Sequence, residues 1–140
     1  MALVNADPNL ARRYPPSSWR RAERAFKCSP FRLDLLIALR HQSVSVRQVC
    51  HPQGVKNGYA RRSLPELQAD NELMWLIAVG LLRREVDGQG LTDSFRLTPL
   101  GHHLGDHLEQ LSPSQLRPTW GDHLNNAWHR WLRLPSWWQG

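Results

Sequence analysis

The chain has 140 residues, a formal net charge of +6 and an apolar fraction of 41%, which predict one globular domain with tails rather than two domains. Two cysteines are too few for a disulfide framework, and the apolar run LMWLIAVGLL is far shorter than the roughly 20 residues that span a bilayer. The first residues, MALVNADPNLARRYPP, lack the pattern of a signal peptide. We therefore expect a cytoplasmic protein with no integral membrane segment, in which Cys28 and Cys50 are reduced core residues rather than a redox pair.

Positive charge is concentrated in the first half of the chain. Residues 1–62 hold twelve Lys and Arg against three Asp and Glu, a net of +9, whereas residues 63–140 hold six against nine, a net of −3. This asymmetry predicts a basic face that attracts a polyanion and a second half that is closer to neutral.

Residues 1–16 are expected to form a flexible N-terminal tail. A helix should follow from Trp19 to about Lys27, with Ser17 or Ser18 as its cap. Its run of arginines has two explanations, a solvated face supported by an ordinary i, i+4 ion pair or an additional arm that contacts phosphates. The side chains that would form such an arm are Arg20 and Arg24.

Two helices and a turn are expected next. Ser29-Pro30 precedes apolar residues at helical spacing from Phe31 to Leu39, which predicts a capped helix there. Ser45 should cap a short helix with the sequence VRQVC, and the sequence HPQG at 51–54 predicts a turn.

The strongest local signals begin at Ser63. Ser63 and Glu66 form an S-x-x-E capping box, and Pro65 stands in the first turn, where its missing N–H has no cost. Apolar residues then line one helix face as far as Gly80, which can adopt the left-handed conformation that ends a helix. We expect one helix between these two points.

A hairpin and another helix should follow. The segments Leu81–Val86 and Ser94–Leu97 have the composition of half-buried strands, and Gly88-Gln89-Gly90 supplies a permissive turn between them. Thr98 is the expected N-cap of a helix that has Pro99 at its first position and runs to about Leu111.

From Phe31 to about Leu108 the chain resembles the winged helix-turn-helix domain of small bacterial transcription regulators. The order of helix, hairpin and helix carries this resemblance, together with the sequences VGLLRRE and FRLTPLG around the hairpin. It implies a mainly α (α+β) fold with a short two-stranded wing, a winged-helix domain over residues 17–111, and helical N- and C-terminal extensions. Through NELMWLIAVGLLRREVDGQGLTDSFRLTPLG, the whole chain is also similar to a small cyanobacterial family of uncharacterised winged-helix-like proteins.

The resemblance implies a non-enzymatic transcriptional regulator that binds double-stranded DNA through the helix after Ser63. That helix holds three acidic residues and no Lys or Arg, so its positive charge must come from neighbouring segments. A protein-interaction adaptor or assembly factor that docks through the Trp-rich C-terminus is therefore the alternative. The residues expected at DNA are Arg20, Arg24, Lys56, Arg61, Arg62, Arg83, Arg84 and Arg96 at phosphates, with Gln68 and Asn71 at bases.

Residues 112–140 are expected to form a Trp-rich extension whose helix places Leu124, Trp128, Trp131 and Leu132 on one face. Large exposed aromatic residues usually mark an interface. Regulators of this shape often dimerise through the helix after the wing, so a homodimer is implied; packing on the core, another protein partner and a membrane surface are the alternatives. The expected interface residues are Trp120, Trp128, Trp131, Trp137 and Trp138.

No motif for catalysis or for a cofactor is found in the sequence. His103 and His107 have the i, i+4 spacing of two zinc ligands, but no Cys-x-x-Cys or His-Glu-x-x-His motif supplies further ligands. Solvated or core-edge histidines account for them more simply. We expect no enzymatic activity, no cofactor and no metal.

Overall fold

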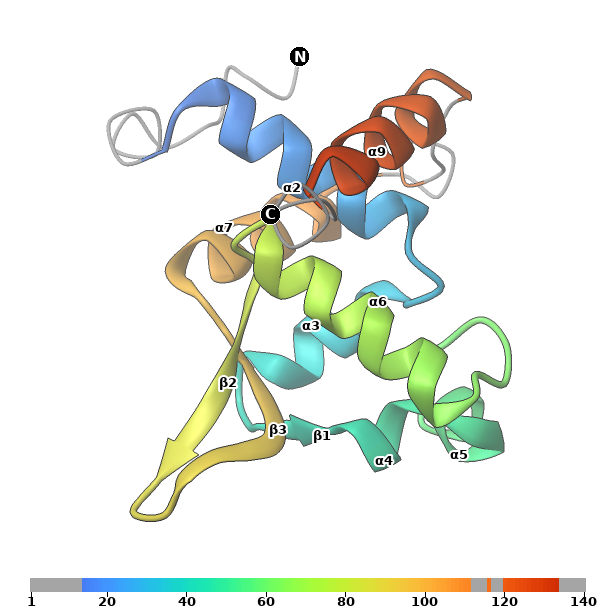
Figure 1. Ribbon diagram of the computed structural model, residues 1–140, viewed down its shortest axis with the longest axis vertical. Coiled ribbons are helices and arrows are strands. Elements are labelled where there is room, and N and C mark those ends of the chain that lie inside the picture. Colours follow the sequence, from blue (N-terminus) through green and yellow to red (C-terminus); the bar gives the residue numbers. More distant parts are fainter. Residues whose placement is uncertain (1–13, 112–115, 117–119, 134–140) are drawn as a thin grey trace.

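The computed structural model describes residues 14–111, 116 and 120–133, with the backbone alone at positions 91, 120, 129 and 131–133. This part of the chain is mainly helical and contains one small sheet, so the α+β class is confirmed (Figure 1). The helices are α2 (Pro16–Cys28), α3 (Leu33–Leu39), α4 (Val46–Val49), α5 (His51–Lys56), α6 (Glu66–Ala78), α7 (Pro99–Glu109) and α9 (Trp120–Arg133). The strands are β1 (Val44–Ser45), β2 (Leu82–Asp87) and β3 (Gly90–Leu97).

The three strands form an antiparallel sheet in the order β1-β3-β2. The predicted hairpin is confirmed, but β3 begins at Gly90, four residues before the expected start at Ser94. Strand β1 has only two residues, too few to show an alternating pattern in the sequence. Phe95 on the central strand lies opposite both Val44 and Arg84. It is buried, and so it fixes the sheet against the core.

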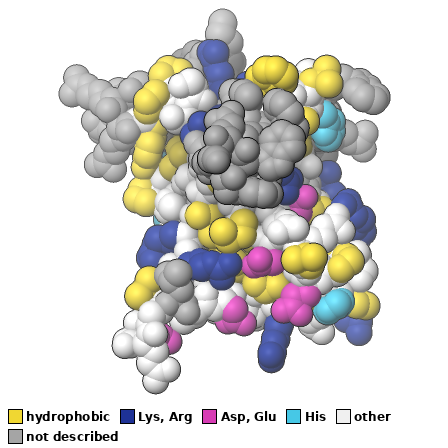
Figure 2. Space-filling model, in the orientation of Figure 1, with side chains coloured by type: hydrophobic (Ala, Val, Ile, Leu, Met, Phe, Trp, Pro, Cys, Tyr) yellow, Lys and Arg dark blue, Asp and Glu magenta, His cyan; other side chains and the backbone are white. Residues whose placement is uncertain are grey.

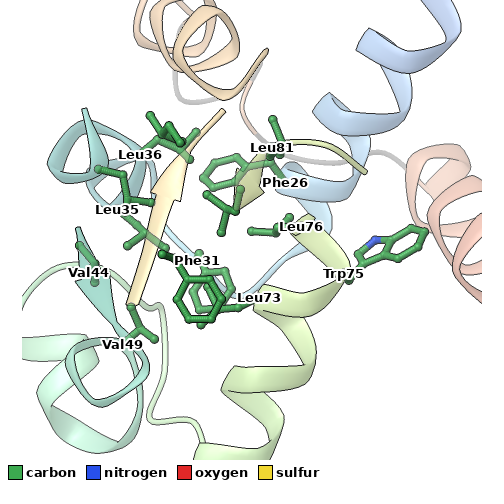
Figure 3. Close-up of a cluster of buried hydrophobic side chains, with 14 of the residues drawn as sticks. Phe26, Phe31, Leu35, Leu36, Val44, Val49, Leu73, Trp75, Leu76 and Leu81 are labelled. Carbon is green, nitrogen blue, oxygen red and sulfur yellow. The ribbon is translucent and has the colours of Figure 1, made fainter. Parts of the chain in front are cut away.

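The core lies between the sheet and the helices. Figure 3 shows Phe31, Leu35, Leu73 and Leu76 gathered from α6 and from the segment that contains α3, and each of them is at most 1% exposed. Burial of each such side chain stabilises the fold by roughly 1.5–3 kcal/mol. Trp75, one position before Leu76, points away from this cluster toward α9 (Figure 3).

The start of α6 corrects the capping box predicted at Ser63. The helix begins at Glu66, Pro65 is its N-cap residue, and no side chain caps it. The physical reason is tertiary, because Leu64 is fully buried and its carbonyl accepts a 2.7 Å hydrogen bond from the backbone N–H of His51. This contact holds the residues before Glu66 in an extended path.

The serine caps expected at either end of α2 are also wrong. The helix begins at Pro16 with Pro15 as its N-cap residue, and neither Ser17 nor Ser18 caps it. At the other end, the hydroxyl of Ser29 donates a 2.6 Å hydrogen bond to the carbonyl of Phe26. Ser29 therefore ends α2 rather than starting the next helix.

Helix α3 starts later than expected because the chain first pairs with a distant segment. Phe31 forms an antiparallel β-bridge with Ala60, and the N–H of Arg32 donates to the carbonyl of Tyr59 at 2.8 Å. Residues held in a bridge cannot adopt helical angles, so α3 begins at Leu33.

The segment predicted as a turn at 51–54 belongs to helix α5. Pro52 stands in its first turn, where proline is tolerated, and Gly54 allows a close approach to α4. A Cβ atom at Gly54 would lie 2.0 Å from the carbonyl oxygen of Val49. Close packing of two short helices, rather than a loop, is the reason for glycine here.

Three local predictions are confirmed. Gly80 has a φ of +89° and ends α6. Ser45 is the N-cap residue of α4, and its N–H donates to the side chain of Gln48 at 2.9 Å. The hydroxyl of Thr98 accepts a 3.1 Å hydrogen bond from the N–H of Gly101 and caps α7.

The two expected extensions lie partly outside the described residues. Of the predicted tail, positions 1–13 lie outside them, Tyr14 packs on the core, and Pro16 is already in α2. Of the Trp-rich extension, positions 112–115, 117–119 and 134–140 lie outside them. Among the helices that are described, none is both long enough and apolar enough to cross a bilayer.

Candidate nucleic-acid interface

Three cations precede the N-terminus of α6. Lys56 is the last residue of α5, and Arg61 and Arg62 lie in the segment that connects α5 to α6. All three are exposed, and no ion pair to another described residue is formed by any of them. We call Lys56, Arg61 and Arg62 the α5–α6 cations.

The backbone around the α5–α6 cations is held in place. The N–H of Arg61 donates to the carbonyl of Pro30 at 2.9 Å, and the N–H of Tyr59 donates to the carbonyl of Gly54 at 2.9 Å. The side chain of Asn57 donates to the carbonyl of Gln48 at 2.9 Å and so ties α5 to α4. These cations therefore project from a fixed segment, which reduces the entropy lost when they bind an anion.

Two of the three acidic residues on α6 are neutralised by other elements. Asp70 lies 3.3 Å from Arg84 on β2, and Glu72 lies 3.1 Å from Arg130 on α9. Only Glu66, at the start of the helix, has no such pair among the described residues, and it is exposed. The helix is therefore much less repulsive to an anion than its sequence indicates.

The predicted base-reading residues lie on the N-terminal half of α6. Asn71 is exposed and Gln68 is half-buried. Figure 2 shows acidic side chains over the middle of the face that carries α6, with Lys and Arg side chains on either side. Cations thus flank the helix, although they do not form one continuous basic surface on this face.

The three predicted arginines of the hairpin have different surroundings. Arg84 is bound to Asp70, donates to the carbonyl of Thr92 at 3.3 Å and stacks over Phe95 at 5.0 Å, so it joins the hairpin to α6. Arg96 pairs with Glu85 at 3.0 Å. Arg83 lies directly opposite Arg96, is exposed and is in no ion pair with a described residue.

The Arg96–Glu85 ion pair on the hairpin also lowers the pKa of Glu85. Hydrogen bonds from Arg96, and then from Ser43, hold the pKa of Glu85 below its usual value. Glu85 therefore stays charged well into the acidic range and remains available to bind Arg96.

Arg20 and Arg24 lie elsewhere. Both are on α2, which crosses the end of the molecule opposite α5 and the hairpin tip (Figure 1). The structure therefore does not bring them together with the α5–α6 cations. The sequence does not reveal this separation, because the composition of α2 says nothing about how far α2 lies from the α5–α6 cations.

Helix α9 contacts α6 through side chains at Glu72 and Trp75, and the sequence does not indicate this contact. The indole N–H of Trp75 donates to the side chain of Asn126 at 2.8 Å, and the guanidinium of Arg130 lies 5.8 Å from the Trp75 ring. Asn126 and Arg130 are 51 and 55 residues away from Trp75 in the sequence, so no local spacing could have found these contacts. The N-terminal turn of α6 is open, and Glu66 and Leu67 are exposed there.

The two large apolar side chains of α9 that the structure describes, Leu124 and Trp128, are exposed. Leu124 is 68% exposed and Trp128 is 60% exposed, whereas Asn126 and Arg130 face α6. Of the other predicted interface residues, the backbones of Trp120 and Trp131 belong to α9, and Trp137 and Trp138 lie outside the described residues.

The histidines considered as zinc ligands contact aromatic rings of the N-terminal segment. His103 packs edge-on against Tyr14 at 6.2 Å, and His107 packs edge-on against Trp19 at 5.7 Å. Within the described ranges, no group of three or more His, Cys, Asp or Glu residues could hold a metal ion.

Both cysteines are free thiols, and we expect them to react slowly. Burial, reinforced by the charge of Asp122, raises the pKa of Cys28 to about 11, and burial raises the pKa of Cys50. At pH 8 the thiolate fraction of Cys28 is then about 0.1%, which predicts a rate with Ellman's reagent about 100-fold below that of an exposed cysteine. The rate should rise as the pH approaches 11. The variant Cys50→Ala leaves Cys28 as the single thiol, and the absorbance of the released reagent follows its reaction rate. The same variant under denaturing conditions is the reference. Equal rates for the native and the denatured variant would contradict the prediction.

Comparison with known proteins gives one match. No curated protein and no solved structure matches the chain. A family model described as Npun_F0494-like matches residues 12–130, which extend from before α2 into α9. Because this match covers most of the sequence, the chain belongs to the Npun_F0494-like family.

Proposed function

We propose that residues from α3 to β3 form a winged helix-turn-helix domain that binds double-stranded DNA. The order helix, strand, helices, hairpin, with β1 as the third strand beside β3, supports this assignment. In such a domain α6 is the recognition helix and the β2–β3 hairpin is the wing. The function would be that of a non-enzymatic transcriptional regulator.

The observation that carries the proposal is the set of exposed α5–α6 cations next to the free end of α6. Phosphate contacts supply most of the affinity of such domains. The N-terminus of a helix is also a favourable place for an anion, because its backbone N–H groups and dipole are positive. Arg83 on the wing would add a fourth contact, and Asn71 and Gln68 would reach adenine edges.

The ion pairs of α6 answer the main objection to DNA binding. Asp70 and Glu72 would repel phosphates if they were unpaired, but Arg84 and Arg130 neutralise them. Arg84 and Arg96 consequently hold the hairpin in place and do not contact phosphates in this proposal. Arg20 and Arg24 are left out of the DNA-binding site because α2 lies at the end of the molecule opposite α5 and the hairpin tip.

A salt series tests the proposal. Phosphate contacts by the three α5–α6 cations alone should give a slope of about −3 in log affinity for random duplex DNA against log salt, and Arg83 would make it steeper. Affinity should then fall roughly 40-fold between 50 and 200 mM salt. Weak binding with a flat slope would rule out the DNA-binding function.

A protein-interaction adaptor is the second candidate, and one observation favours it. Leu124 and Trp128, one turn apart on α9, are 68% and 60% exposed and form an apolar pair on the surface. Large apolar side chains on a surface commonly mark a protein interface. In this case Trp128→Ala would abolish partner binding and leave the affinity for DNA unchanged.

A further inference from the structure

The exposed side of α6 carries a row of uncharged side chains. Leu67, Asn71 and Met74 follow one another at helical spacing, and all three are exposed, Leu67 by 73%. Leu73 and Leu76 lie on the opposite side of the helix and are buried in the core. We call Leu67, Asn71 and Met74 the α6 row, and it is the part of α6 that points away from the domain.

Neighbouring elements bound the α6 row on both sides. On one side the guanidinium of Arg84 binds Asp70 at 3.3 Å and also donates to the sulfur of Met74 at 3.2 Å. On the other side Arg130 of α9 binds Glu72 at 3.1 Å. These contacts neutralise the two carboxylates beside the row and engage its last member with the hairpin. The first two members of the row are therefore the ones that a partner meets.

The amide of Asn71 is complementary to adenine. It presents an acceptor and a donor side by side, and adenine presents the matching pair in the major groove, its N6 amino group and N7. Guanine presents two acceptors there, so the amide oxygen would lie against O6 with no hydrogen between them. Guanine is usually read by Arg or Lys, and α6 contains neither. The Asn71 side chain forms no hydrogen bond with another described residue, so no internal bond has to break.

Leu67 is complementary to thymine. Thymine is the base that presents a methyl group in the major groove, and apolar side chains contact it there. Leu67 precedes Asn71 by one helical turn, which is roughly 6 Å along the helix axis. That distance corresponds to about two base-pair steps of 3.4 Å. The two side chains therefore reach the same short run of base pairs.

We propose that α6 selects A·T base pairs through the major groove, with Leu67 at a thymine methyl group and Asn71 at an adenine about two base pairs away or closer. This inference rests on the proposed DNA-binding function and adds the class of DNA that the protein prefers. Glu66, exposed at the start of α6, accepts from the amino group of adenine or of cytosine alike and so does not favour G·C pairs. The α5–α6 cations supply affinity without regard to sequence, so the selectivity comes from the α6 row.

Alternating duplexes of equal length test which bases and which groove are read. The set consists of A-T, G-C, I-C, in which inosine replaces guanine, and A-U, in which uracil replaces thymine. An inosine·cytosine pair has the minor-groove pattern of A·T and the major-groove pattern of G·C, so it separates readout in the two grooves. By fluorescence anisotropy, the native protein should bind the A-T duplex roughly 5- to 150-fold more tightly than the G-C and I-C duplexes. It should bind A-T about fourfold more tightly than A-U, which lacks the methyl group.

Two single variants assign the readout to residues. Leu67→Ala should bring the affinities for A-T and A-U within about twofold of each other, because most of the surface that contacts the methyl group is lost. Asn71→Ala should lower the preference for A-T over I-C at least about fivefold. The matched controls are Leu124→Ala and Asn125→Ala, which change exposed residues of the same types on α9 and should keep the native preferences. All four positions are exposed, so the fold should survive each change.

The outcomes separate this inference from the DNA-binding function. Salt-dependent binding with equal affinity for the A-T and G-C duplexes would overturn the inference and leave the DNA-binding function standing. Equal affinity for A-T and I-C would place the readout in the minor groove and would also overturn it, as would native preferences in Leu67→Ala or in Asn71→Ala. Binding of no duplex in a salt-dependent manner would overturn the DNA-binding function itself, and this inference with it.

Discussion

Replacement of the three α5–α6 cations should remove most of the salt dependence of DNA binding. In the variant Lys56→Gln/Arg61→Gln/Arg62→Gln, we expect the salt slope to fall by about 3 and the affinity at 0.1 M salt to fall roughly 100- to 1,000-fold. The reason is that each phosphate contact releases a condensed counterion, and this release is worth about tenfold in affinity at that salt concentration. Fluorescence anisotropy with a labelled random duplex measures both quantities.

A charge-preserving triple variant provides the control for this experiment. Lys56→Arg/Arg61→Lys/Arg62→Lys keeps all three charges on the same exposed positions, and it should retain a slope near that of the native protein. Circular dichroism of both variants should match that of the native protein, because none of the three side chains forms an ion pair with a described residue. If the glutamine variant bound DNA as tightly as the native protein, the proposed phosphate contacts would be wrong.

Gly101→Ala should destabilise the protein by about 1–3 kcal/mol, although alanine normally favours a helix interior over glycine by about 1 kcal/mol. Gly101 is buried in the first turn of α7. A Cβ atom there would lie 2.3 Å from the carbonyl oxygen of Leu81 and 2.8 Å from the side chain of Leu97. The backbone oxygen cannot move freely, because it accepts hydrogen bonds from the backbone N–H and the hydroxyl of Thr98.

Urea unfolding followed by circular dichroism measures this change. The matched control is Gly88→Ala at the hairpin tip, where an added Cβ atom would have no neighbour within 4 Å, so we expect a change within about 0.5 kcal/mol. A Gly101→Ala variant at least as stable as the native protein would mean that α7 does not pack this closely against the start of β2.

The acidic character of α6 illustrates why the candidate site could be predicted only in part. Spacing and composition identified the helix, its three carboxylates and the cations that precede it, because these properties belong to short stretches of sequence. The pairing of Asp70 with Arg84 and of Glu72 with Arg130 depends on the docking of the hairpin and of α9. The charge that a partner would meet is therefore a tertiary property.

The sequence by itself determined the features that depend on neighbouring residues: the left-handed end of α6 at Gly80, the cap of α7 at Thr98 and the hairpin between them. Only the tertiary structure decided where α3 and α6 begin, which cations remain exposed beside α6, and that Arg20 and Arg24 lie on a helix away from those cations. The physical reason is range. A cap or a positive φ is fixed within a few residues, whereas the β-bridge of Phe31 with Ala60 and the hydrogen bond from His51 to Leu64 override local capping by joining segments that meet only when the core packs.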